Sequence, residues 1–230
     1  MKKIKIEVYS DYACPFCYIG KRYLEQALAQ FEYAENVEII HKAYELYPQV
    51  GSEVTGTTQE RIEWKYHKTA EEALEMIRNI ESLAIRAGIA MNYENTQNTN
   101  TFTAHRLAKF TERKGKGEEM HERLMKAYFV ENLPLADCEN LVRLAADIGL
   151  NETEVMEFLD DDLLSDEVCS DEEQAKQIGV EAVPFFMING EISVLGSQPP
   201  EQFLLLLEQI YQANNTQFAQ GVSCGIDGCH

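Results

Sequence analysis

Alternating apolar and polar residues open the chain and predict a strand over residues 3–9. Apolar residues then recur at helical spacing, which predicts a helix over residues 15–31, and residues 37–41 predict a second strand. Because a helix separates the two strands, we expect them to lie parallel and to be joined by a crossover connection.

The middle of the chain has a helical pattern from about residue 59 to residue 177, interrupted by glycine and proline. Asp137 and Asp171 stand where the N-caps of two of these helices are expected. A β pattern then returns on both sides of Asn189-Gly190, a residue pair typical of a tight hairpin turn. A last amphipathic helix is predicted from Pro200 to about residue 213.

This order of elements predicts an α/β fold that is interrupted by a large helical insertion. Residues 1–55 and 178–213 are expected to form the α/β domain, residues 56–177 the insertion, and residues 214–230 a C-terminal tail. A chain of 230 residues with 45% hydrophobic residues is large enough and apolar enough for one such domain with an insert.

The charge balance narrows the range of partners. With 39 acidic and 20 basic residues the formal net charge is -19, which argues against nucleic acid or an anionic membrane as a partner. No continuous apolar run precedes Asp11 and none is long enough to span a bilayer, so we expect a cytoplasmic protein. In that compartment six cysteines do not indicate a disulfide framework, and Cys138 and Cys169 are interpreted as structural thiols.

The motif Cys14-Pro15-Phe16-Cys17 lies directly between the first predicted strand and the helix that follows it. This position puts Cys14 at the helix N-terminus, where free backbone N–H groups and the helix dipole stabilise a thiolate. Pro15 suits the first helical position, and Cys17 returns to the same helix face three residues later. We therefore predict a redox dithiol with Cys14 as an exposed nucleophile and Cys17 as the resolving thiol. Half of a zinc site is the alternative for the same spacing.

Val183-Pro184 is the second motif with a chemical interpretation. Proline is tolerated at the first residue of a strand, and it also occurs in cis-proline loops, which would leave the backbone of Val183 free to pair with an extended substrate. His105, early in a predicted helix, is either a structural histidine or a residue that faces the active site and tunes the thiolate. For Tyr44, Tyr47 and Trp64 core packing is expected, with a substrate groove as the alternative.

Taken together, these motifs resemble the thioredoxin-fold proteins of the DsbA-like group, and within that group the FrnE family of dithiol-disulfide isomerases. Four stretches carry the resemblance, which extends to about residue 213: residues 10–21, residues 100–107, residues 179–186 and residues 196–201. The resemblance implies a thioredoxin-like fold with a helical insertion, Cys14 as nucleophile, Cys17 as resolving thiol, and Pro184 as a cis-proline facing them. Pro15, Phe16, Val183 and His105 are expected at the substrate-binding surface.

The implied partners are disulfide or dithiol substrates, either proteins or small molecules, with glutathione as a candidate. Neither a cofactor nor a metal is predicted, and both a monomer and a homodimer remain open. The alternative function is that of a glutathione-dependent transferase or isomerase, as in the related kappa-class transferases and hydroxychromene isomerases. Those enzymes have serine where this chain has Cys14, which weakens the alternative.

Cys224 and Cys229, in the tail, form a candidate second redox pair that would exchange with the first if the tail folds back. An idle tail and a metal site completed by His230 are the alternatives. Neither the motif nor the resemblance determines whether the protein oxidises, reduces or isomerises its substrates, because direction follows the reduction potential.

Overall fold

The computed structural model describes residues 3–221 of the chain, with side chains up to residue 215. Its sheet has four strands in the order β2-β1-β3-β4. The strands are β1 (Ile4–Ser10), β2 (Val37–Ala43), β3 (Phe185–Ile188) and β4 (Ile192–Leu195). The first two are parallel, as predicted, and β3 is antiparallel to both β1 and β4. Asn189 and Gly190 both have positive φ, which confirms the predicted tight turn between β3 and β4.

Two helices pack together against the sheet and enclose the smaller of two hydrophobic cores. They are α1 (Pro15–Leu28), which forms the crossover between the parallel strands, and α9 (Pro200–Gly221). Phe203 and Leu207 of α9 are buried against Ile6 and Phe186 of the sheet. Because α9 continues eight residues beyond the predicted end of the last helix, residues 214–221 belong to this helix rather than to an irregular tail.

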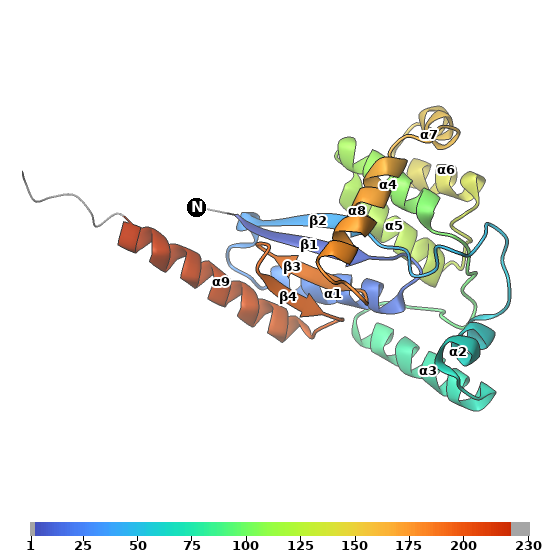
Figure 1. Cartoon of the computed structure of the whole chain (residues 1–230), viewed down its shortest axis with the longest axis horizontal. Helices are drawn as coiled ribbons and strands as arrows, with labels where there is room; N and C mark the ends of the chain where they lie inside the picture. The colour runs from blue at the N-terminus through green and yellow to red at the C-terminus, as the bar shows by residue number, and fades with distance from the viewer. Residues whose placement is uncertain (1–2, 222–230) are drawn as a thin grey trace, which may run out of the picture.

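Seven helices come between β2 and β3 in the described chain: α2 (Thr58–Tyr66), α3 (Ala70–Arg86), α4 (Phe102–Arg113), α5 (Gly117–Phe129), α6 (Cys138–Asp147), α7 (Glu152–Leu159) and α8 (Ser165–Gln177). Most of them gather at the end of the sheet toward which β1 runs, and α9 extends past the opposite end (Figure 1). The larger hydrophobic core joins these helices to the residues that follow β1, including Tyr12, Cys14 and Cys17. The order and layers match the expected thioredoxin-like fold with a helical insertion.

Three local predictions about this region have different outcomes. Asp137 is confirmed as an N-cap, since its side chain accepts a hydrogen bond from Glu139 N. The prediction for Asp171 is wrong: it lies inside α8, buried, and pairs with Lys42 (2.8 Å) and Lys109 (2.5 Å). Trp64 is 75% exposed, which contradicts core packing, because α2 turns this position away from the protein. No helix within residues 3–221 combines the length and apolar character needed to cross a membrane.

Candidate active site

Cys14 occupies the N-cap position of α1, and Pro15 follows in the first turn of the helix. The backbone N–H of Cys14 donates to Asp11 O (3.1 Å) and that of Cys17 to Cys14 O (3.0 Å), so the motif forms a tight turn. Both cysteines are free thiols. The predicted placement of Cys14 at the N-terminus of the helix is confirmed, although its side chain makes no capping hydrogen bond.

The loop before β3 lies against Cys14. The Val183–Pro184 peptide bond is cis, and the Cys14 thiol donates to the carbonyl oxygen of Val183 over 3.5 Å. Pro184 O accepts a hydrogen bond from Gly196 N (2.8 Å), which ties the loop to the residue after β4. The structure thus brings together the two motifs that the sequence places 169 residues apart.

Burial of the dithiol differs from the prediction. Cys14 is 4% exposed and Cys17 is 2% exposed, so the expectation of an exposed nucleophile is wrong for this conformation. Residues of the helical insertion, including Tyr93, share a hydrophobic core with Cys14 and cover the motif, and Tyr47, which follows β2, packs against the same core. Burial raises the pKa of both tyrosines, and negative charge on the Cys14 sulfur raises the pKa of each further.

Cys17 has the electrostatic character of a resolving thiol. Burial raises its pKa well above the usual value, and the hydrogen bond and charge of Cys14 raise it further. Cys17 is therefore held in the protonated thiol form.

Asp11, three residues before Cys14, is a buried carboxylate that joins three segments around the motif. Its side chain accepts hydrogen bonds from Ala13 N (3.1 Å) in the motif turn, from Leu46 N (2.6 Å) after β2, and from the Thr101 hydroxyl (2.8 Å) before α4. Thr101 stands at the N-cap position of α4, but its side chain makes no capping hydrogen bond there. Asp11 was not among the predicted site residues, although an acidic residue three positions before the first cysteine of the motif was a visible signal.

Among the described residues, His105 makes no hydrogen bond with either cysteine. Its Nε2 atom is 3.6 Å from Asp11 Oδ1 and has no hydrogen-bond partner, and its ring is 4.7 Å from that of Tyr12. At 4% exposure its side chain is part of the buried core. Phe16, by contrast, is half-buried beside the cysteines, and Pro15 is buried.

A cavity of about 20 Å³ borders Cys17 on the side of α5, and its volume suits a single water molecule. Apolar residues of the sheet and α1 line part of it, and polar side chains line the rest: Lys21, Glu25, His41, Glu118 and His121. Cys17 thus faces a space that leads toward charged groups rather than only toward apolar core.

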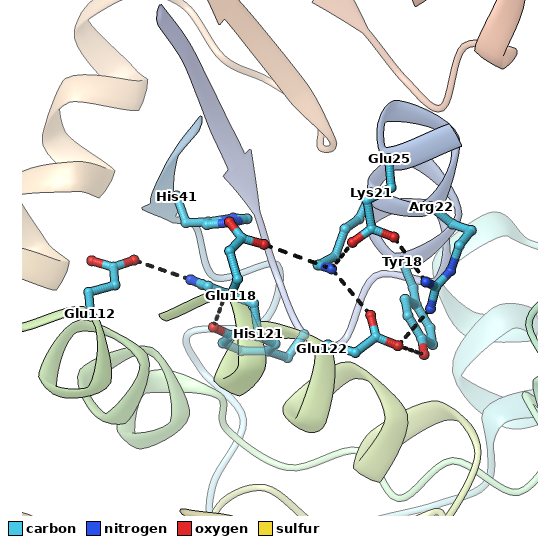
Figure 2. Close-up of polar contacts among 10 residues, drawn as sticks. Tyr18, Lys21, Arg22, Glu25, His41, Glu112, Glu118, His121 and Glu122 are labelled. Carbon is cyan, nitrogen blue, oxygen red and sulfur yellow. Dashed lines mark hydrogen bonds and ion pairs between the residues drawn. The ribbon is translucent and has the colours of Figure 1, made fainter. Parts of the chain in front are cut away.

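Those charged groups belong to a network between α1 and α5 (Figure 2). Glu122 accepts from Arg22 (2.6 Å) and Lys21 (3.2 Å), and Glu118 pairs with His41 (2.7 Å).

His121 hydrogen-bonds to the Tyr12 hydroxyl through Nδ1 (2.7 Å) and contacts Glu112 through Nε2 (3.2 Å). Burial, followed by the positive charge of neighbouring residues, holds the pKa of His121 well below its usual value.

Cys138 and Cys169 do not join this site. Cys138 and Cys169 are exposed, which contradicts their interpretation as buried structural thiols. The predicted second pair, Cys224 and Cys229, lies outside the described residues. Within the part of the chain that the structure describes, no three or more His, Cys, Asp or Glu residues are grouped as ligands for a metal ion.

Comparison with known proteins agrees with this geometry. A probable DsbA oxidoreductase from Streptomyces coelicolor is 32% identical, with 99% of this chain and 98% of that protein covered and a TM-score of 0.85. A 2-hydroxychromene-2-carboxylate isomerase is 16% identical, with 94% and 98% covered and a TM-score of 0.66. The cytosolic disulfide reductase DsbM from Pseudomonas aeruginosa, solved with GSH, is 15% identical, with 90% and 99% covered and a TM-score of 0.59.

The two more distant structures share the fold, and at their identities they show the fold alone. The model of the family described as DSBA-like thioredoxin domain matches residues 5–208, which is most of the chain. The sheet order, the dithiol at the start of α1 and this match lead to one conclusion: the chain belongs to the family of DSBA-like thioredoxin domains.

Proposed function

We propose that this protein is a thiol-disulfide oxidoreductase that exchanges disulfides through the Cys14/Cys17 dithiol. One observation carries the proposal: the Cys14 thiol stands at a helix N-terminus, 3.5 Å from the carbonyl of Val183, with the protonated Cys17 behind it. A nucleophilic sulfur at a helix end with a second sulfur one turn away is the arrangement that disulfide exchange requires.

The exchange proceeds in two balanced steps. The Cys14 thiolate attacks one sulfur of a substrate disulfide, that S–S bond breaks, and one substrate thiolate leaves and takes up a proton. Cys17 then loses its proton and attacks Cys14, which forms the Cys14–Cys17 disulfide and releases the second substrate thiol. The substrate gains two electrons and two protons, and the reverse sequence oxidises a dithiol.

The proton of Cys17 needs an exit because the thiol is buried. Asp11 lies near Cys17, but its carboxylate oxygens already accept three hydrogen bonds. The cavity beside Cys17 offers the other route, through one water toward Lys21, His41 and Glu118. We place the proton transfer of the second step in this cavity.

Substrate binding follows from the same arrangement. The backbone of Val183, before the cis-proline Pro184, pairs with the chain on either side of the reacting sulfur, and Pro15 and Phe16 line the approach. His105 supports the motif turn beside Asp11 rather than touching the substrate. The motifs quoted in the sequence analysis favour the FrnE group within the family.

The partners we propose are disulfides and dithiols of small molecules or proteins, with glutathione among them, in the cytoplasm. The fold shared with DsbM, a cytosolic disulfide reductase whose structure was solved with GSH, supports both the compartment and glutathione. Whether the protein acts as a monomer or a homodimer is independent of this proposal.

The test measures the reduction potential of the dithiol in glutathione buffers by thiol trapping and mass shift, with Cys14→Ser and Cys17→Ser as companions. We expect a reversible two-electron transition in the wild type, loss of exchange in Cys14→Ser, and a trapped mixed disulfide in Cys17→Ser. If Cys14 and Cys17 never form a disulfide in any buffer, the proposal fails. The potential itself decides between reductase and oxidase, since about 30 mV corresponds to about 1.4 kcal/mol.

A second candidate is a glutathione-dependent isomerase or transferase, which the fold shared with 2-hydroxychromene-2-carboxylate isomerase supports. In this candidate glutathione supplies the reacting sulfur, and the two protein sulfurs are dispensable. Turnover of a small electrophile with glutathione that survives in the Cys14→Ser variant would favour it over disulfide exchange.

A further inference from the structure

Two cations on one face of α2 contact Tyr47, a residue that packs against the core cluster containing Cys14. Arg61 and Lys65 are one helical turn apart, and both are half-buried. The Lys65 ammonium donates to the Tyr47 hydroxyl (3.1 Å) and lies 4.5 Å from the centre of its ring. The Arg61 guanidinium lies 5.7 Å from the centre of the same ring. Both charges therefore converge on Tyr47.

Neither cation forms an ion pair with a carboxylate among the described residues. The guanidinium of Arg61 donates only to neutral oxygens, those of Tyr128 (3.3 Å) and Thr96 (3.4 Å). This is unusual because a half-buried charge without an opposite charge beside it costs free energy, and carboxylates are abundant in a chain of net charge -19.

The two nearest carboxylates on the same helix are engaged elsewhere. Glu60 accepts from the backbone of Thr57 (2.7 Å) in the capping box that starts α2. Glu63 accepts from Gln59 (2.7 Å). The helix thus presents two positive charges, with their negative neighbours turned to other partners.

Tyr47 connects these charges to the reacting sulfur. It packs against the core cluster that contains Cys14, and negative charge on Cys14 is among the causes, after burial, that raise the pKa of Tyr47. An anionic group bound by Arg61 and Lys65 would therefore lie beside Tyr47, at the edge of the core cluster that contains Cys14.

We propose that Arg61 and Lys65 form an anion-recognition site that guides low-molecular-weight disulfides carrying carboxylates to Cys14. The proposal rests on the proposed disulfide exchange and adds the substrate class to it. A guanidinium binds a carboxylate through two parallel hydrogen bonds, and Lys65 adds a second positive charge one turn away. Because the insertion leaves Cys14 only 4% exposed, a small disulfide has readier access to the sulfur than a folded protein does.

The experiment compares two aromatic disulfides of similar size, the dicarboxylate 5,5′-dithiobis(2-nitrobenzoate) and the neutral 2,2′-dithiodipyridine. Each reaction consumes the reduced Cys14/Cys17 pair, forms one protein disulfide and releases two reagent thiols, which are followed by absorbance in stopped flow. The full-length chain carries C138S, C169S, C224S and C229S, because Cys138 and Cys169 are exposed and would also react.

In this background we expect Arg61→Gln and Lys65→Gln to slow the reaction with the dicarboxylate about tenfold each, and the reaction with the neutral reagent less than about twofold. Added salt should slow the reaction of the unsubstituted background with the dicarboxylate. It should therefore narrow the difference in rate between this background and the two Gln variants. Arg61→Lys should restore part of the rate. Arg78→Gln, an exposed charge on α3, is the matched control and should change neither reaction.

An equal loss with both reagents would overturn the proposal, because it would show that the cations act on the Cys14 thiolate and not on the substrate. Thermal melts identify a variant that fails to fold, and the Arg61→Lys variant then carries the comparison. If the unsubstituted background reacts with neither reagent, the proposed disulfide exchange fails as well. If the background reacts with the neutral reagent and the Gln variants react with the dicarboxylate as fast as the background does, only the anion site is overturned.

Discussion

The Cγ atom of Pro184 lies 3.1 Å from the point at which residue 20 would carry a Cβ atom if it were not glycine. Gly20 is on α1, six residues after Cys14, so its missing side chain lets the cis-proline loop approach the helix that carries the dithiol. The ring of Phe186 (3.4 Å) and the backbone of Ser197 (3.5 Å) surround the same point.

Gly20→Ala should therefore push the loop away from Cys14. We expect it to lower the free energy of unfolding by about 1–3 kcal/mol, the usual cost of overpacking, and to slow disulfide exchange. Urea unfolding and exchange rates with a neutral disulfide measure the two effects. Gly51→Ala is the control, because no atom lies within 4 Å of its Cβ position. If Gly20→Ala and Gly51→Ala were equally stable, the close contact between Pro184 and the Cβ position of residue 20 would be contradicted.

Asp11→Asn should destabilise the motif turn. The asparagine keeps one acceptor oxygen, but its amide would face the N–H of Leu46, which donates over 2.6 Å to the carboxylate, and two donors would then oppose each other. We expect a loss of about 1–3 kcal/mol in the free energy of unfolding. The pKa of Cys17 should also fall, since the charge of Asp11 is one of the causes that raise it.

Urea unfolding and thiolate absorbance in a Cys14→Ser background measure these two effects. Thr101→Val is the matched variant, since it removes one donor to Asp11 and leaves the charge in place. It should cost less stability and leave the Cys17 titration near that of the background. A Cys17 pKa that rises in Asp11→Asn would show that the carboxylate acts in another way.

The stability of the protein should decrease as the pH falls through about 6.5, the ordinary pKa of histidine. Burial, followed by the positive charge of His41 and nearby lysines, keeps the native pKa of His121 well below that value. Below about pH 6.5 the unfolded chain therefore binds a proton that the native protein does not, and the free energy of unfolding falls by up to about 1.4 kcal/mol per pH unit.

His121→Gln should flatten this dependence, whatever its effect on stability at neutral pH. Urea unfolding at a series of pH values gives the slope for each protein. His67→Asn, at the exposed end of α2, should keep the wild-type slope. Parallel curves for the wild type and His121→Gln would rule out His121 as the titrating group.

The tail cysteines should not be coupled to Cys14 within one molecule. The helix α9 begins beside the cis-proline loop and runs to the other end of the sheet (Figure 1). There the ring of Tyr211 stacks on that of Tyr33, with 3.9 Å between the ring centres. The 22 residues of α9 span about 33 Å. The chain from Gly221 reaches at most about 11 Å to Cys224 and about 29 Å to Cys229, and both lengths are shorter than the helix.

The variant with Cys224→Ser and Cys229→Ser should therefore keep the wild-type reduction potential of the Cys14/Cys17 pair. Thiol trapping in glutathione buffers, run at two protein concentrations, measures it. A shift that grows with concentration would indicate exchange between molecules, and a shift independent of concentration would contradict the predicted separation.

Short-range patterns in the sequence determined the elements that depend on neighbouring residues. Alternation at residues 3–9 predicted β1 because each side chain of a strand points to the face opposite its neighbour. Asn189-Gly190 predicted the hairpin because both residues tolerate positive φ. The dithiol was placed correctly at the start of α1 because a strand, a motif with Pro15 and a helix follow one another directly.

Only the tertiary structure decided what depends on residues far apart in the chain. Cys14 is buried because an insertion that begins more than forty residues later covers it, and Asp171 became a buried ion-pair partner because Lys42 and Lys109 meet there. Asp11 joins three segments, and Arg61 and Lys65 converge on Tyr47, through contacts for which no local periodicity exists. A residue type and its spacing specify the conformation of its own element, whereas the charges and surfaces that meet it are set by the packing of elements against one another.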